Sequence, residues 1–143
     1  MNDIVWTINP DNDSFIKVYR KLHSYAISVA EAHDVKVNFS ESGIANDQRL
    51  NMEDRKNLYL IAKEAINNAI KYSKCRNLNV IMKRSNDRLV MEISDDGIGF
   101  DPSVAVNGNG LRNIRERVDE MKAELNFSTC NKGTTVAVSL RIP

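Results

Sequence analysis

The sequence is poor in the residues and segments that mark several classes of protein. Its 143 residues include two cysteines, Cys75 and Cys130, which form no CxxC pair, and two histidines. So few cysteines and histidines suit neither a disulfide framework nor a zinc site, so both thiols are expected to be reduced. No apolar run approaches the ~18 residues that indicate a membrane span, and the N-terminus lacks the layout of a signal peptide. We therefore expect a cytoplasmic domain.

A large net charge is also missing. Twenty Lys and Arg residues face 19 Asp and Glu residues, which leaves a formal charge of +1. This balance argues against a nucleic-acid or membrane-surface partner. There is no GxxxxGK[ST] motif and no HRD catalytic loop, which excludes P-loop enzymes and kinases of the HRD type. The whole sequence is 42% hydrophobic and 27% charged, a composition typical of one folded domain.

The spacing of apolar residues predicts alternating helices and strands. Three helices are expected at about 15–30, 53–73 and 111–122, and strands at 35–40, 78–83, 89–94, 124–129 and 134–142. Asn86-Asp87 is a predicted turn, and Asn131-Lys132-Gly133 separates the last two strands. Helices combined with antiparallel hairpins indicate an α+β sandwich.

Three polar residues of the helix expected at 53–73 lie on one face. Glu64, Asn68 and Lys71 stand at positions i, i+4 and i+7. A carboxylate, a carboxamide oxygen and an ammonium in line can hold a hydrated magnesium ion and a phosphate tail. Taken alone, the same row is better interpreted as the charged face of a surface helix.

Glycines at alternate positions follow the strand expected at 89–94. In DDGIGF, Gly97 and Gly99 remove side chains where a flat ligand or a phosphate group approaches the backbone, and Asp95 can accept a hydrogen bond from an amino group. An ordinary Asp-Gly turn is the alternative interpretation.

A second glycine pair opens the helix expected at 111–122. The N-terminus of a helix attracts anions, so Gly108-Asn109-Gly110-Leu111 is a candidate phosphate-binding segment. The alternative is an Asn-Gly turn that simply starts the helix.

The order and spacing of these motifs resemble one family. Glu64-xxx-Asn68-xx-Lys71-Tyr72, Asp95-x-Gly97-x-Gly99, Gly108-x-Gly110-Leu111 and Gly133-Thr134 are similar to the N, G1, G2 and Gly-Thr motifs shared by gyrase, the Hsp90 chaperones, histidine kinases and the MutL proteins. The resemblance runs from about residue 53 to the end of the chain. It implies a Bergerat-type fold, a two-layer sandwich in which a mixed, largely antiparallel sheet is backed by three helices. ATP with Mg²⁺ is the implied ligand.

The resemblance also implies a role for each motif residue. Asp95 is expected to accept the adenine amino group, with Thr134 assisting through a shared water molecule. Asn68 is expected to bind Mg²⁺. Glu64 either helps to hold the metal, as more often in histidine kinases, or activates water, as in ATP-hydrolysing relatives, so both are candidate catalytic and metal-binding residues. Lys71 is expected to meet phosphate.

The remaining motif residues are expected to enclose the nucleotide. Tyr72 would lie against it and Leu111 would stand at the helix start beside it. The glycines would let a flexible lid and its anchors close over the phosphates: Gly97, Gly99, Gly108 and Gly110.

The lid between Gly99 and Gly108 is short, which favours one branch of the family. DDGIGFD, GNGLRNIRERV and GTTVAVSLRIP resemble sensor histidine kinases related to those that sense nitrate and membrane fluidity. MNDIVWTINP is similar to the end of the helix pair that carries the phosphoacceptor in such kinases. We therefore predict a tail of that helix pair at 1–10 and an ATP-binding catalytic domain at 11–143, belonging to a membrane-anchored bacterial sensor.

This resemblance implies a partnership rather than an autonomous enzyme. The γ-phosphate of ATP would pass to a histidine on the kinase's own helix pair, a dimer in the full-length protein, and then to a response regulator. His23 and His33 lack the charged neighbours of a phosphoaccepting histidine, so the acceptor is expected elsewhere. A stand-alone anti-sigma-factor serine kinase of the same fold, or a nucleotide-binding domain without catalysis, remains the alternative.

Overall fold

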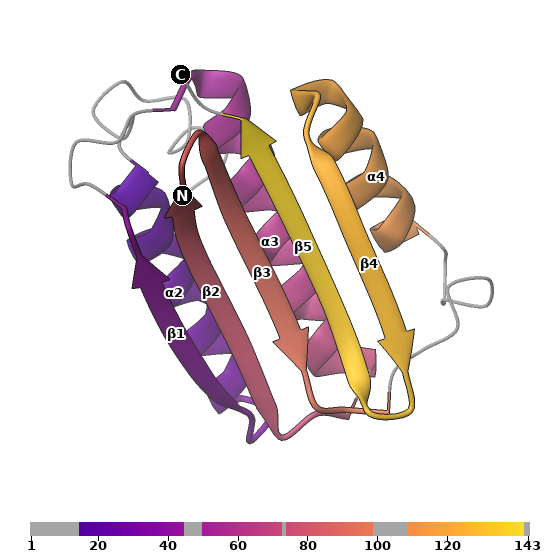
Figure 1. The fold of residues 1–143 in the computed structure, drawn as a ribbon. Helices are drawn as coiled ribbons and strands as arrows, with labels where there is room; N and C mark the ends of the chain where they lie inside the picture. Colours follow the sequence, from indigo (N-terminus) through magenta and orange to yellow (C-terminus); the bar gives the residue numbers. More distant parts are fainter. Residues whose placement is uncertain (1–14, 45–49, 73, 99–108, 142–143) are drawn as a thin grey trace.

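The computed structural model describes residues 15–44, 50–72, 74–98 and 109–141. These ranges form three helices and five strands (Figure 1), and every predicted element is found within two residues of its expected bounds. In chain order the elements are α2 (Phe15–Glu31), β1 (Lys36–Ser42), α3 (Met52–Tyr72), β2 (Asn77–Ser85), β3 (Arg88–Asp95), α4 (Asn109–Met121), β4 (Glu124–Cys130) and β5 (Gly133–Arg141). The predicted tail at 1–10 lies outside the described residues.

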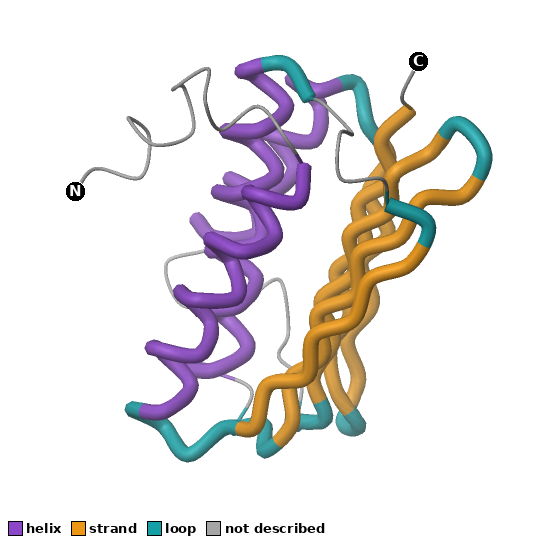
Figure 2. The backbone as a smooth tube through the Cα atoms, turned by 90° about the vertical axis from the view of Figure 1, so that its left-hand side faces the viewer, coloured by secondary structure: helices purple, strands orange, loops and turns teal. Residues whose placement is uncertain are grey.

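The strands form one mixed sheet in the order β1-β2-β3-β5-β4. β1 runs parallel to β2, and the other neighbours are antiparallel. All three helices lie on the same side of this sheet (Figure 2). The predicted α+β two-layer sandwich is therefore confirmed, and among the described residues no helix has both the length and the apolar character needed to cross a membrane.

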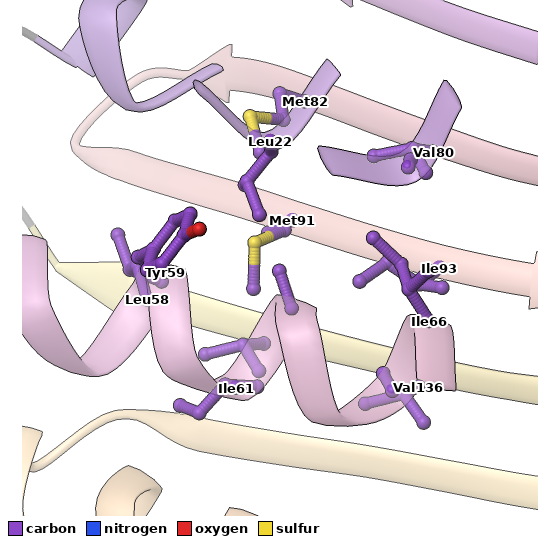
Figure 3. Close-up of a cluster of buried hydrophobic side chains, with 14 of the residues drawn as sticks. Leu22, Leu58, Tyr59, Ile61, Ile66, Val80, Met82, Met91, Ile93 and Val136 are labelled. Atoms are coloured by element: carbon purple, nitrogen blue, oxygen red, sulfur yellow. The ribbon is translucent and has the colours of Figure 1, made fainter. Parts of the chain in front are cut away.

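The core lies between the sheet and the helices. Alternate residues of the central strands face inward, because successive side chains of a strand point to opposite faces. Val80, Met91 and Ile93 meet Ile61 and Ile66 of α3 in this layer (Figure 3), and all five are at most 2% exposed. Full burial of one such side chain contributes about 1.5–3 kcal/mol, so this layer fixes α3 firmly on the sheet.

The topology brings the last residue of β3 and the first residue of β5 together at the same end of the sheet. β3 ends at Asp95 and β5 begins at Gly133, side by side in the sheet (Figure 1). The β4–β5 turn contains only Asn131 and Lys132, because Gly133 pairs with Cys130. The prediction that Gly133 belongs to the turn is thus wrong by one residue.

Candidate functional site

One pocket brings together four of the predicted site residues. Asn68 of α3, Asp95 at the end of β3, Leu111 of α4 and Thr134 of β5 all line it. The rest of its wall is apolar and comes from both layers: Ala65, Ala69, Ile93, Ile114, Phe127 and Val136. The enclosed space is small, about 10 Å³, so it is the lining, apolar walls with a few polar groups from separate elements, and not the volume that is typical of a site for a flat organic ligand.

The carboxylate of Asp95 is oriented by its own loop. Its Oδ1 accepts a hydrogen bond of 2.9 Å from the backbone N–H of Gly97, which is buried. A carboxylate has two oxygens and can accept several hydrogen bonds, so this contact orients the group without using all of the hydrogen bonds that it can accept. Gly97 therefore positions Asp95.

Gly133 lets β5 approach the end of β3 closely. Its φ is +138°, and a Cβ atom at this position would collide with the backbone carbonyl oxygen of Asp95. An L-residue rarely adopts this φ, so both the conformation and the contact require glycine. The sequence marked Gly133 as part of a motif but gave it no role of its own.

Thr134 is only 5% exposed, and its hydroxyl is held by a neighbouring strand. Its Oγ1 lies 2.8 Å from Oγ1 of Thr129, the residue opposite it on β4. Sequence reasoning missed Thr129, because the predicted turn Asn131-Lys132-Gly133 would have set Cys130 opposite Thr134, whereas the observed turn sets Thr129 there.

Asp96 is a second carboxylate that sequence reasoning left without a role. Its Oδ1 accepts hydrogen bonds of 2.9 Å from the backbone N–H groups of Arg76 and Asn77, and its Oδ2 accepts one of 2.8 Å from Asn77 Nδ2. The bond from the Asn77 side chain, with those from the two backbone N–H groups, holds the pKa of the Asp96 carboxyl below its usual range.

The structure separates the two adjacent asparagines of α3. Asn68 lines the pocket, whereas Oδ1 of Asn67 accepts a 2.7 Å hydrogen bond from the hydroxyl of Tyr25 on α2. Lys63 lies over the ring of the same tyrosine, with Nζ 5.1 Å from its centroid. Asn67 therefore joins two helices and also lines a different hollow from Asn68, the one that contains Glu64.

Glu64 and Lys71 do not line the pocket with Asn68. Glu64 faces a second hollow, between α3 and α4, whose wall includes Arg117. Ile114 of α4 lines both hollows and so separates them. Lys71 is exposed at the end of α3.

Part of the predicted site cannot be placed. Gly99 and Gly108 lie outside the described residues, and the side chain of Tyr72 is not described. Gly110 is the second residue of α4, as expected of a glycine at a helix start. An anion at this end would meet the N–H groups of the first helical turn.

The comparisons with known proteins show the family of the chain. The family described as histidine kinase-, DNA gyrase B-, and HSP90-like ATPase matches residues 53–143. The chain therefore belongs to this family of ATPases, which implies ATP binding and confirms the resemblance found in the motifs.

Among curated proteins, the chain is similar to signal-transduction histidine kinases. It is 33% identical to the histidine-protein kinase/phosphatase UhpB of Salmonella typhimurium over 95 residues, which is 66% of this chain and 19% of that protein. It is 31% identical to the histidine-protein kinase/phosphatase DegS of Bacillus subtilis over 111 residues, which is 74% of this chain and 29% of that protein. The chain thus spans less than a third of either relative.

A solved structure confirms the fold independently. The histidine kinase AdeS of Acinetobacter baumannii superposes with a TM-score of 0.73 at 15% identity, covering 91% of this chain and 66% of that one. At this identity the likeness concerns the fold, and it covers more of the chain than the family match does.

Proposed function

We propose that residues 11–143 are the ATP-binding catalytic domain of a two-component sensor histidine kinase. In this role the domain presents the γ-phosphate of ATP to a histidine on a separate helical domain, to which residues 1–10 would connect it. The observation that carries the proposal is that Asn68, Asp95, Leu111 and Thr134 line the same pocket. The two kinase relatives support the choice of this branch over the gyrase-like and chaperone-like branches.

Adenine would bind where β3 ends and β5 begins. The oriented carboxylate of Asp95 would accept a hydrogen bond from the adenine amino group, and the Thr134 hydroxyl would add a water-mediated contact. The apolar side chains around them suit the faces of a purine ring. Leu111 and Tyr72 would lie against the nucleotide.

The phosphate end of the nucleotide would lie toward α3 and the start of α4. Mg²⁺ prefers oxygen ligands and keeps water and phosphate oxygens in its shell, so one or two protein oxygens suffice. The carboxamide oxygen of Asn68 would meet this requirement from the pocket, and the carboxylate of Glu64, one helical turn away, would add a second oxygen only by reaching out of the neighbouring hollow that it lines. Lys71 would add positive charge, and Gly97, Gly99, Gly108 and Gly110 would let the backbone close on the phosphates.

Catalysis by this chain would consist of positioning and charge neutralisation. Phosphoryl transfer requires the attacking nitrogen, the γ-phosphorus and the leaving oxygen in line, with the developing charge stabilised. Bound Mg²⁺ would neutralise phosphate charge. The chain's own part is to orient the base through Asp95 and the metal-bearing end through Asn68. The phosphohistidine would then pass its phosphoryl group to a response regulator. The domain itself would lie in the cytoplasm, as part of a membrane-anchored, dimeric sensor.

The test uses the chain with labelled ATP and Mg²⁺. We expect it to bind ATP but to gain no stable phosphohistidine, because neither His23 nor His33 has the context of an acceptor. Adding a histidine-bearing helix pair of the parent protein as a separate polypeptide should place label on the helices. The yield should be low, since a covalent link normally supplies a high effective concentration. Acid-labile label on either histidine of the chain itself would contradict the proposal, and label on a serine of an added partner would favour a serine kinase.

A further inference from the structure

Asp96 stands between the carboxylate proposed to bind adenine and the glycine that orients it, yet its own side chain binds another strand. From these contacts we infer that Asp96 is a positioning residue for nucleotide recognition. It fastens the loop that carries Asp95 to the start of β2. The inference rests on the proposed role of Asp95 as the acceptor of the adenine amino group.

Four hydrogen bonds join Asp96 to two consecutive residues. Its carboxylate accepts the three described above, from Arg76 N, Asn77 N and Asn77 Nδ2, and its own N–H donates to Asn77 O at 3.3 Å. The paired residues of β2 and β3 end with Leu78 opposite Asp95. Asp96 therefore extends the connection between the two strands beyond the last pair, at the point where the chain turns toward the pocket.

The neighbours of Asp96 explain why this fastening matters. Asp95 Oδ1 is held by the N–H of Gly97, so the direction of the carboxylate depends on the path of the backbone through residue 96. On the other side of the loop, Gly133 closes on the carbonyl oxygen of Asp95 and lies near Cα of Asp96. The loop is thus confined between β5, through backbone contact, and β2, through the Asp96 side chain. Removing the side chain leaves only the 3.3 Å bond from the Asp96 N–H to Asn77 O on the β2 side of the loop.

The chain offers a graded set of variants. Asp96→Ala removes the three bonds to the carboxylate, whereas Asn77→Ala removes only the one from Nδ2. Asp96→Asn combined with Asn77→Asp exchanges the two groups, so an amide donor again faces a carboxylate while Oδ1 of residue 96 can still accept both backbone N–H groups. Asp87→Ala is the matched control, because Asp87 is an exposed aspartate at the other end of β3.

The measurement is the affinity for ADP relative to purine riboside 5′-diphosphate, which lacks the amino group that Asp95 would bind. Thermal unfolding without nucleotide is recorded beside it. For Asp96→Ala we expect a roughly tenfold loss of ADP affinity, equivalent to weakening one hydrogen bond to a charged group, and little change for the analogue. Asn77→Ala should lose less, the exchanged pair should regain most of the preference for ADP, and Asp87→Ala should match the parent protein.

The outcomes separate this inference from the proposal beneath it. If the parent protein shows no preference for ADP over the analogue, the role of Asp95 is refuted and this inference with it. If the parent protein prefers ADP and Asp96→Ala keeps that preference, or loses both ligands in equal measure, only the positioning role is refuted. Should Asp96→Ala fail to fold, the comparison of Asn77→Ala with the exchanged pair decides: an unchanged preference in both overturns the inference.

Discussion

Replacing Asp95 by asparagine probes the adenine contact with almost no change of shape. Oδ1 of residue 95 accepts the N–H of Gly97 at 2.9 Å, and an asparagine oxygen can keep that bond. Its amide NH₂ then takes the place of the second carboxylate oxygen and presents a donor to the adenine amino group, itself a donor. The variant therefore loses a charge-assisted hydrogen bond and gains a mismatch.

The expected loss follows from the kind of bond. Hydrogen bonds to charged groups contribute about 1.5–3 kcal/mol, so ADP affinity should fall roughly 10- to 150-fold. The new NH₂ group can donate to the 6-oxo group of hypoxanthine, so inosine diphosphate should lose far less affinity than ADP or even gain. Isothermal titration of both nucleotides measures the two effects. Asp87→Asn, the same substitution at an exposed position paired with Arg141, is the control and should bind like the parent protein.

Two results would refute this reasoning. Unchanged ADP affinity in Asp95→Asn would show that this carboxylate does not contact the base. An equal loss of ADP and inosine diphosphate would show that the residue shapes the pocket without reading the amino group. A normal unfolding temperature of the variant is required in both cases, so that a loss of binding is not a loss of fold.

Three further substitutions test other parts of the site. Asn68→Ala should weaken Mg²⁺-dependent ATP binding at least tenfold while adenosine affinity stays constant, and Asn67→Ala should leave both unchanged in the same titrations; equal losses of ATP and adenosine would make Asn68 structural. Gly133→Ala should destabilise the fold by about 1–3 kcal/mol or more in urea unfolding and also weaken ADP binding, whereas Gly43→Ala, strained against the Arg84 carbonyl oxygen, should only destabilise. Because the folded pKa of Asp96 lies below the ordinary 3.8, its stabilising contribution is present above that value and disappears as the pH falls through the folded pKa. The difference in unfolding free energy between the parent protein and Asp96→Ala should therefore shrink below about pH 4, and a constant difference would contradict this assignment.

The elements of the fold could be predicted because each has a clear apolar period. Ile61, Ala65 and Ile66 of α3 repeat with helical spacing, and Leu78, Val80 and Met82 of β2 alternate, and all six are buried. The parallel pairing of β1 with β2 could not be derived from such periods, because strand order depends on which faces must be covered in three dimensions. The resemblance to a known fold supplied it as a mixed sheet.

The polar row of α3 shows where helical spacing stops being informative. Glu64, Asn68 and Lys71 do lie along one helix, but α4 packs against it, and Ile114 of α4 lines both the hollow of Glu64 and the pocket of Asn68. The spacing of residues on one helix cannot reveal where a second helix will contact it. The prediction that these three residues act together therefore remains untested.

The residues that sequence reasoning overlooked contact parts of the chain outside their own segment: Asp96 contacts the start of β2, and Thr129 contacts the site residue Thr134. Asp96 reaches residues 19 and 20 positions earlier in the chain, and Thr129 reaches across a hairpin to Thr134. Asp96 looks like an ordinary turn residue in the sequence because its partners become visible only when the register of β2 with β3 is known. Supporting contacts of this kind are local in space but distant in sequence.

These supports divide the site into two parts with different origins. The groups proposed to bind the base lie on strand ends, where Asp95 is confined by Gly97 and Gly133 and Thr134 is held by Thr129. The groups proposed for metal and phosphate lie instead on α3 and at the start of α4. A site residue on a strand end inherits the rigidity of the sheet, since hydrogen bonds to neighbouring strands fix its backbone. Base recognition in this domain should therefore depend on the contacts between strands, and metal and phosphate binding on how α3 and α4 are packed.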